Sequence, residues 1–360
     1  MKKKEDGIMN KKGLFFITGA LLFGLVGLGY GQSSRVGTTT ANFLEIGFGG
    51  SGSAMGEACV SMINDLSALY WNPAGLGYME QSEAHFTVQP WIVDINTSFT
   101  GVGLVLPTIG TLALGIYQVD YGQMPVTNLQ QQTGTGETFG ANDLAISFAF
   151  SRKLAQWFSF GASAKYVSSK IWHTNASAVA VDLGVMLNTH FFSTTGEKSD
   201  GMNIGMSISN YGTKMKYDGM DLLYPIDILP GESGNYQDAS GQFRLEGWEL
   251  PLIFRVGVAL HPLVLNNHRV TVSMDALHPN NNTESVNVGA QYQLKLPTVG
   301  SFFLRGGYKA LFMEESEYGP TFGGGFLLRL MGNVGLRADY CYKDMGLLGN
   351  THCYSIGILF

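Results

Sequence analysis

The chain has 360 residues, of which 14 % are charged, 45 % are hydrophobic and 48 are glycine. An average soluble protein has about 25 % charged residues, so this composition argues against an ordinary water-soluble globule. A helical membrane protein is excluded because no run of about 20 apolar residues follows the N-terminal region. No basic patch or stripe points to nucleic acid. The strands of a membrane β-barrel alternate apolar and polar residues, which fits the near-neutral mean hydropathy of +0.08.

The first 31 residues are predicted to be an export signal. Five lysines precede or enter an apolar run at 14–28, and Gly29 and Gly31 offer a cleavage site before Gln32. Removal of this segment takes away five lysines and two acids, which lowers the formal net charge from −6 to −9.

The next stretch, residues 42–82, differs from everything that follows it. Its apolar residues lie near helical spacing and are followed by a turn-rich break at 70–75. We expect a short helix or two and then a tight loop. The residues that carry the helical spacing are Met55, Cys59, Met62, Leu66 and Leu69.

From residue 84 onward the pattern has period two, which predicts strands. Fourteen strands are expected, an even number, as single-chain bacterial barrels have. Most are near or above the 9–11 residues that a tilted strand needs to cross a bilayer. The predicted strands are 84–93, 97–106, 110–121, 142–153, 157–170, 176–190, 201–210, 247–261, 268–277, 284–296, 300–310, 320–330, 333–343 and 351–360.

The alternation is clear in single strands. In 268–277 the residues Val272 and Met274 oppose Ser273 and Asp275, and the last strand ends on an apolar face that includes Phe360. If both termini lie in the periplasm, the odd-numbered connections are extracellular and should be the long ones. The two longest, 122–141 and 211–246, are the third and the seventh, whereas the even-numbered connection 191–200 is longer than expected. A soluble β-sandwich would also alternate, but it explains neither the low charge nor this loop asymmetry.

One segment carries a specific resemblance. DLSALYWNPAGLG at 65–77 resembles the N-terminal plug of FadL-like outer-membrane transporters, and 43–76 is more similar still to the opening of the PorV/PorQ family. The segments 208–222 and 248–260 agree with that family. The resemblance implies a signal peptide at 1–31, a plug segment at 32–82 and a transmembrane β-barrel at 83–360, in the outer membrane of a Gram-negative bacterium of the Bacteroidetes type.

Within the plug, the motif formed by Asn72, Pro73, Ala74 and Gly75 is the candidate site. An asparagine can cap or bridge backbone groups, proline fixes φ and lacks a donor, and the two small residues allow close packing against a wall. We expect charged residues on the lumen face to pair with one another and with plug groups such as Glu57 and Asp65; the alternative is a polar path for a substrate. These lumen charges are Lys165, Asp182, Arg255, Asp275, Arg305, Lys309, Arg329, Arg337 and Asp339.

The resemblance implies a non-enzymatic role in type IX protein secretion. Its partners would be secreted proteins with C-terminal sorting domains, other subunits of that system and outer-membrane lipid. The expected partner-binding loop includes Lys214, Lys216, Asp218 and Asp221. The alternative is a FadL-like transporter that takes an apolar small molecule across the outer membrane; a third interpretation is a purely structural membrane protein. Fold alone does not separate them.

No cofactor, metal or catalytic residue is expected. Residues 47–52 match G-x-G-x-x-G, but no βαβ unit surrounds them. The seven histidines lack metal-ligand spacing. Of the three cysteines, Cys341 and Cys353 are placed to face each other in the last hairpin, and both a disulfide and free thiols remain open.

Overall fold

The computed structural model describes residues 35–360 except 235–237, 314–315 and 331. The chain divides into two compact units, 1–35 and 36–360, and the second is described here. The predicted export signal, 1–31, lies outside the described residues. Among the described residues, no helix has the length and apolar composition needed to span a bilayer.

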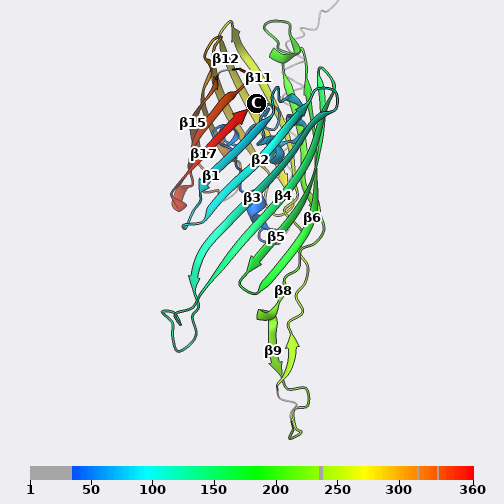
Figure 1. Cartoon of the computed structure of the whole chain (residues 1–360), viewed down its shortest axis with the longest axis vertical. Coiled ribbons are helices and arrows are strands. Elements are labelled where there is room, and N and C mark those ends of the chain that lie inside the picture. Colours follow the sequence, from blue (N-terminus) through cyan, green and yellow to red (C-terminus); the bar gives the residue numbers. More distant parts are fainter. Residues whose placement is uncertain (1–34, 235–237, 314–315, 331) are drawn as a thin grey trace, which may run out of the picture. The chain divides into compact units, whose positions relative to one another are not determined.

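The second unit is a closed antiparallel β-barrel of fourteen strands (Figure 1). Each barrel strand pairs with its neighbour in the chain, and β1 pairs with β17, so that Glu83 lies opposite Leu359 and the sheet closes. The barrel strands are β1 (Glu83–Pro90), β2 (Asn96–Leu106), β3 (Gly110–Pro125), β4 (Thr138–Ala155), β5 (Phe158–Ile171), β6 (Thr174–Asn188), β7 (Asn203–Gly212), β11 (Ile253–Leu265), β12 (His268–Pro279), β13 (Ser285–Leu296), β14 (Gly300–Leu311), β15 (Pro320–Arg329), β16 (Gly335–Asp344) and β17 (Asn350–Leu359).

All fourteen predicted strands are confirmed; the largest displacement of a start is in the eighth, and the fourth begins at Thr138, four residues earlier than predicted. The eighth was predicted from 247, but β11 begins at Ile253. Pro251 lacks the N–H that a ladder needs, and its carbonyl accepts a hydrogen bond from the Asn210 side chain instead (2.9 Å). The apolar alternation at 248–252 therefore belongs to the approach to the strand.

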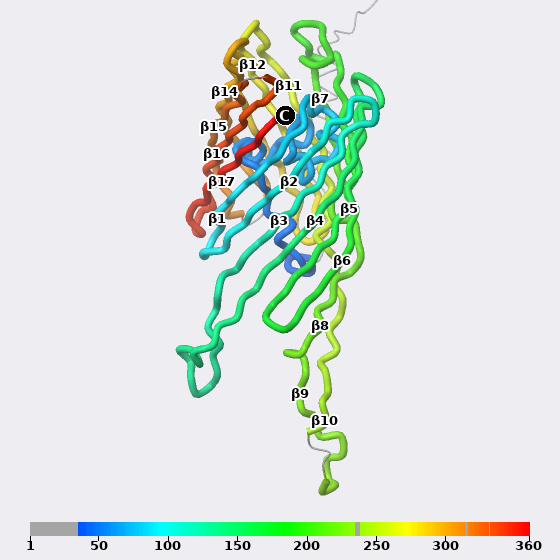
Figure 2. Tube along the Cα trace, viewed as in Figure 1, coloured from blue at the N-terminus to red at the C-terminus, as the bar shows by residue number. Residues whose placement is uncertain are grey.

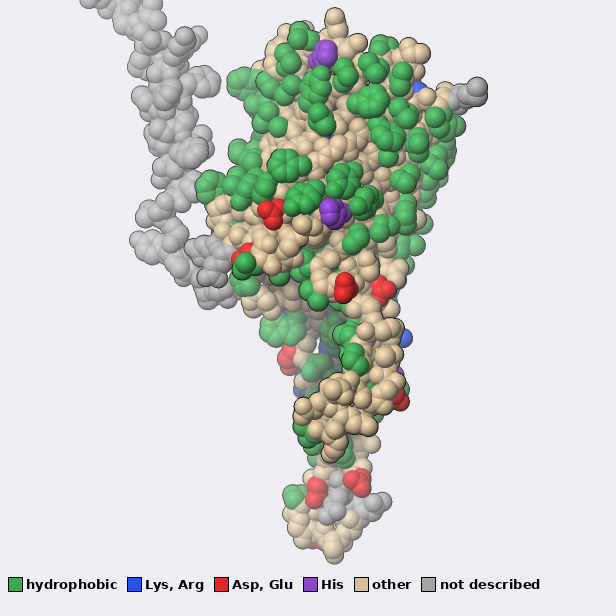
Figure 3. Space-filling view, turned by 90° about the vertical axis from the view of Figure 1, so that its left-hand side faces the viewer, with side chains coloured by type: hydrophobic (Ala, Val, Ile, Leu, Met, Phe, Trp, Pro, Cys, Tyr) green, Lys and Arg blue, Asp and Glu red, His purple; other side chains and the backbone are tan. Residues whose placement is uncertain are grey.

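The period-two pattern separates an outer face from a lumen face. In β11, Phe254 is exposed whereas Arg255 is buried, and in β17 Tyr354 is exposed whereas Ser355 is buried. Figure 3 shows hydrophobic side chains spread over the barrel surface on that side. A barrel with apolar side chains outside and polar side chains inside matches the pattern of a barrel surrounded by lipid. Because the sheet closes on itself, the β-sandwich alternative is excluded.

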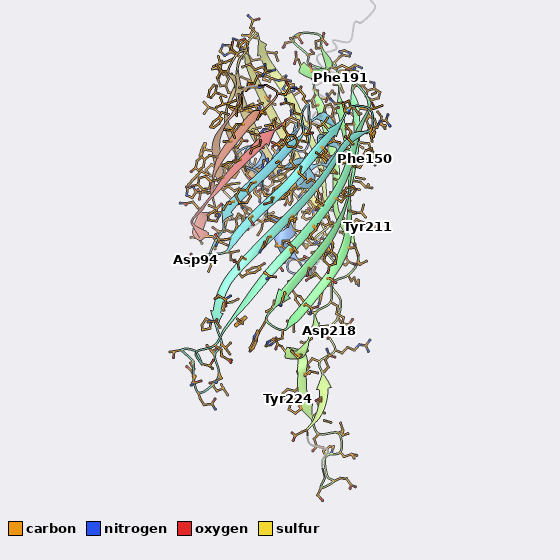
Figure 4. All side chains as sticks on the ribbon, viewed as in Figure 1. Asp94, Phe150, Phe191, Tyr211, Asp218 and Tyr224 are labelled. Carbon is orange, nitrogen blue, oxygen red and sulfur yellow. The ribbon has the colours of Figure 1, made fainter. Side chains whose placement is uncertain are left out.

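The two ends of the barrel differ. We call the end with connections 91–95, 126–137, 172–173, 213–252, 280–284, 312–319 and 345–349 the loop end, and the opposite end the turn end. The longest connection, 213–252, contains β8 (Asp218–Gly219), η4 (Met220–Leu222), β9 (Leu223–Ile226) and β10 (Ala239–Gln242). In Figure 4, Asp218 and Tyr224 lie at the opposite end of the molecule from Phe191, which belongs to the turn-end connection 189–202.

Residues 36–82 precede the barrel, and we call them the plug. They contain η1 (Asn42–Glu45), α2 (Gly50–Ser53), α3 (Ala68–Trp71) and η2 (Pro73–Tyr78), and most of them from 43 to 76 are buried. Two short helices, α2 and α3, are present, but the stretch between them, which carries most of the helical spacing from Met55 to Leu69, is irregular. A segment buried on every side has no single apolar face, so the spacing did not report a helix.

Candidate functional site

The plug motif is held by hydrogen bonds to the plug itself and to the barrel wall. The Asn72 side-chain oxygen accepts from the Ala74 N–H (3.1 Å), and its amide nitrogen donates to the carbonyls of Val60 (2.8 Å) and of Val185 in β6 (3.1 Å). Pro73 occupies the first position of η2, where no donor is missed. The sequence therefore places an amide where one side chain caps η2 and ties it to the wall.

Two wall hydroxyls complete this contact. The Ala74 carbonyl accepts hydrogen bonds from Ser159 of β5 (2.8 Å) and Ser151 of β4 (3.2 Å), both buried. Gly75 packs within the plug, where a side chain would overlap the Ile63 carbonyl. Asn72, Pro73 and Ala74 thus make the contact that joins the plug to β4, β5 and β6, whereas Gly75 packs inside the plug.

Glycines line the barrel wall where the plug packs against it. At Gly161 and Gly184 a Cβ would overlap Pro73 and Asn72, respectively. At Gly205, Gly289 and Gly307 it would overlap plug backbone between residues 55 and 61. We call these five residues the glycine bed. Sequence reasoning missed it, although its signal, glycine at lumen-facing positions of β5, β6, β7, β13 and β14, was present.

Ion pairs fasten the plug on the other side of the lumen. Glu57 lies 3.0 Å from the ammonium of Lys309 and 3.6 Å from that of Lys343, and Asp65 lies 2.8 Å from the guanidinium of Arg337. Burial alone would raise the pKa of Asp65, but Arg337 together with hydroxyl donors outweighs burial and lowers this pKa to about 2. The pKa of Glu57 is also lowered, since its two lysines outweigh burial. The predicted pairing of lumen charges with Glu57 and Asp65 is confirmed.

The remaining predicted lumen charges are also partnered. Lys165 pairs with Asp182 (2.8 Å), and Arg305 with Asp339. Asp275 accepts the Val60 N–H (2.9 Å). The guanidinium of Arg255 donates to Ser209 and lies over the rings of Tyr70 and Trp71, whereas Arg329 is exposed at the turn end and bonds to a backbone carbonyl there. These charges are held by partners, and four of them, Arg305, Arg329, Arg337 and Asp339, also border the cavity described below.

An aromatic cluster fills the lumen on the β2–β3 side. Phe48 of the plug stacks on Phe99 with ring centroids 4.1 Å apart and meets Tyr117 and Tyr70 at 5.1 Å. All four side chains are buried, and the Tyr117 hydroxyl donates to the plug carbonyl of Ile46. The cluster therefore joins the plug to the wall through ring contacts.

A cavity of about 780 Å³ lies on the turn-end side of the plug. Plug residues such as Met62 and Asp65 border it, and amide and guanidinium side chains such as Gln291, Gln293 and Arg305 line its wall. This chamber is polar, in contrast to the aromatic cluster.

The predicted partner-binding loop has two kinds of residue. Lys214 and Lys216 are exposed. Asp221 accepts hydrogen bonds from the backbone N–H (3.0 Å) and the ring of His173 in the β5–β6 turn, and Asp218 accepts from Gln242. The two acids brace the base of the long connection, and the structure brings neither acid to the plug motif.

The three cysteines are buried free thiols. Cys341 and Cys353 lie directly opposite each other in β16 and β17 as free thiols, buried against Ala54. Among the described residues, no group of three or more histidine, cysteine and acidic side chains is placed to hold a metal ion.

The comparisons with known proteins identify the fold. No family model and no curated protein matches the chain. The structure resembles the monoaromatic hydrocarbon channel CymD (TM-score 0.54, 12 % identity, 87 % of this chain and 96 % of that one) and the toluene transporter TodX of Pseudomonas putida (0.51, 13 %, 87 % and 97 %). It also resembles a FadL homologue of Pseudomonas aeruginosa (0.50, 11 %, 87 % and 98 %). The chain thus has the fourteen-strand barrel fold of FadL-type proteins, whereas the narrower PorV/PorQ assignment stays a prediction.

Proposed function

We propose that this chain is a non-enzymatic outer-membrane transporter of small apolar molecules. The observation that carries the proposal is a closed fourteen-strand barrel whose lumen holds a bound N-terminal plug. The same barrel fold occurs in proteins described as a toluene transporter and a monoaromatic hydrocarbon channel. The apolar outer face supports a membrane location, and the closed β-barrel supports the outer membrane of a Gram-negative bacterium.

The orientation follows from the connections. Outer-membrane barrels have short periplasmic turns and longer extracellular loops, so the loop end faces outward and the turn end faces the periplasm. On the face of the molecule that Figure 3 shows, acidic side chains lie mainly in the half nearer the loop end.

The aromatic cluster supplies the apolar part of a route. Phe48 and Tyr70 are the plug's contribution, so a shift of the plug would expose Phe99 and Tyr117 to an entering molecule. Beyond the plug, the 780 Å³ chamber opens at the turn end. Uptake therefore requires the plug to move, because the plug contacts strands on many sides of the barrel.

A reversible lock on the plug tests this proposal. Ala54 packs against Cys341 and Cys353, so the variant Ala54→Cys with Cys353→Ser places one plug thiol beside one wall thiol. Uptake of labelled toluene and of a labelled alkane by expressing cells should stop on oxidation and recover on reduction. Cys353→Ser alone is the matched control and should respond to neither treatment. Uptake no faster than in cells without the protein would reject transport, and uptake unaffected by a verified cross-link would reject a route past the plug.

The second candidate is the type IX secretion role that the sequence resemblance implies, in a bacterium of the Bacteroidetes type. The observation that favours it is the long connection, whose hairpin β9–β10 extends beyond the barrel (Figure 1). Its side chains Leu223, Tyr224, Ile228 and Phe243 are exposed, which suits a protein partner.

Purification in mild detergent separates the two candidates. Secretion predicts that proteins with C-terminal sorting domains co-purify with the full chain and are lost from a variant lacking 223–242. Because β9 and β10 pair only with each other, this deletion should leave the barrel intact. Retention of the same partners by the shortened chain would refute binding through the hairpin.

A further inference from the structure

The start of the plug contacts the loop end of the barrel. The Thr40 N–H donates to the carbonyl of Glu249 (3.0 Å), and the Thr39 hydroxyl accepts from the side chain of Asn281 (2.8 Å). Glu249 lies just before β11 begins at that end, and Asn281 lies in the β12–β13 connection. In Figure 2 the darkest blue part of the tube lies toward the end from which β8 extends.

The end of the plug contacts the turn end. The Ser82 carbonyl accepts from the N–H of Phe360, and the Gln81 side chain donates to the carbonyl of Asn333 in the β15–β16 turn (both 2.9 Å). β1 then begins at Glu83, opposite Leu359.

The plug between these ends follows the lumen in one direction. Lys343, near the loop end of β16, donates to the carbonyl of Gly47 (3.2 Å), whereas Arg337, two residues into the same strand from the turn end, pairs with Asp65. β16 therefore contacts an earlier plug residue near its loop end and a later plug residue near its turn end. This is the order expected if the plug runs along the lumen from the loop end to the turn end.

We infer that the plug is threaded through the barrel with its leading end displayed at the extracellular mouth. The outward assignment of the loop end rests on the proposed outer-membrane function; the traverse itself rests only on the contacts above. β1 thus starts on the periplasmic side while the segment before it starts on the other. The first residues that the structure describes therefore lie at the loop end, opposite the C-terminal residue Phe360 at the turn end.

The start of the plug is hydrogen-bonded to the long loop-end connection. Glu249 belongs to the long connection, which is pinned at its base by a pair of backbone hydrogen bonds between Met215 and Trp248. The carbonyl of Glu249 accepts the Thr40 N–H of the plug, and Glu249 is the next residue in the chain after Trp248.

Single-cysteine labelling of intact cells with a membrane-impermeant maleimide tests the threading. The probe position is Val36→Cys, because Val36 is 61 % exposed and its substitution removes no packed side chain. Leu129→Cys, 89 % exposed in the loop-end connection 126–137, and Phe192→Cys, 73 % exposed in the turn-end connection 189–202, are matched controls. The native cysteines are buried, so the unmodified chain gives the background.

We expect Val36→Cys to label in intact cells as Leu129→Cys does, with at least tenfold more label than Phe192→Cys, which should react only after permeabilisation. If Val36→Cys labels only with Phe192→Cys, the threading is overturned. If Phe192→Cys labels in intact cells and Leu129→Cys does not, the barrel has the reverse orientation and display at the cell surface is overturned. A recognition tag inserted between Val36 and Gly37 and read by antibody on whole cells gives a second measurement. Neither readout uses a transport substrate, so a failure here is distinct from a failure of the toluene assay.

Discussion

Replacing Gly184 by alanine should release the plug from the β4–β6 wall. The new Cβ would overlap the side-chain oxygen of Asn72 and lie 2.9 Å from Pro73 Cδ, so the amide has to move. Movement gives up three hydrogen bonds of Asn72, each worth about 1 kcal/mol net. With roughly 1 kcal/mol of overpacking, docking weakens by about 4 kcal/mol, which is roughly a thousandfold in its equilibrium constant.

Hydrogen exchange followed by mass spectrometry measures this loss. Amides of residues 60–76 should exchange much faster in Gly184→Ala, while the barrel strands keep their protection. Gly306→Ala is the matched control, because Gly306 lies in a barrel strand but a Cβ there meets no atom closer than 3.6 Å. Equal exchange of the plug in the two variants would show that the glycine bed does not determine how the plug docks.

Three further predictions concern the other plug contacts. The pKa of Asp65 in the folded chain, about 2, lies below the ordinary 3.8, so its ion pair contributes about 2 kcal/mol of stability that is complete above pH 4 and lost as the pH falls through 2. Hydrogen exchange should therefore show that Arg337→Gln releases the plug at a higher pH than the unmodified chain. An unchanged midpoint would contradict this. Phe48→Ala should cost about 3–5 kcal/mol of plug docking and speed toluene uptake, whereas slower uptake with normal expression would argue against a route past this ring. Asn281→Ala removes the hydrogen bond to Thr39 and should raise exchange at 36–46 but not at 60–76, since the two regions have separate anchors; a uniform rise would show that the plug moves as one body.

The barrel could be predicted from the sequence because its strands alternate with a period of two residues. Lipid outside and a polar lumen inside demand opposite side chains at successive residues, as Phe254 and Arg255 show, so that alternation identified every strand. The displaced start of β11 came from Pro251, where apolar alternation continued after ladder bonding had stopped.

The plug was harder to predict for a physical reason. Its residues from Ala54 to Leu66 are mostly buried without forming a helix, because walls on all sides replace the single core face that periodicity detects. The motif around Asn72 was found by resemblance, but its partners Ser151 and Ser159 lie in strands more than 70 residues away. No local pattern could have paired them.

The seam between the first and last strands has a consequence for assembly. Residue 82 leads directly into β1, and β1 joins β17 only after the last residues of the chain have been made. The plug is continuous with the first strand and lies within the sheet that the last strand closes, so the pairing of β1 with β17 is the contact that completes the wall around it.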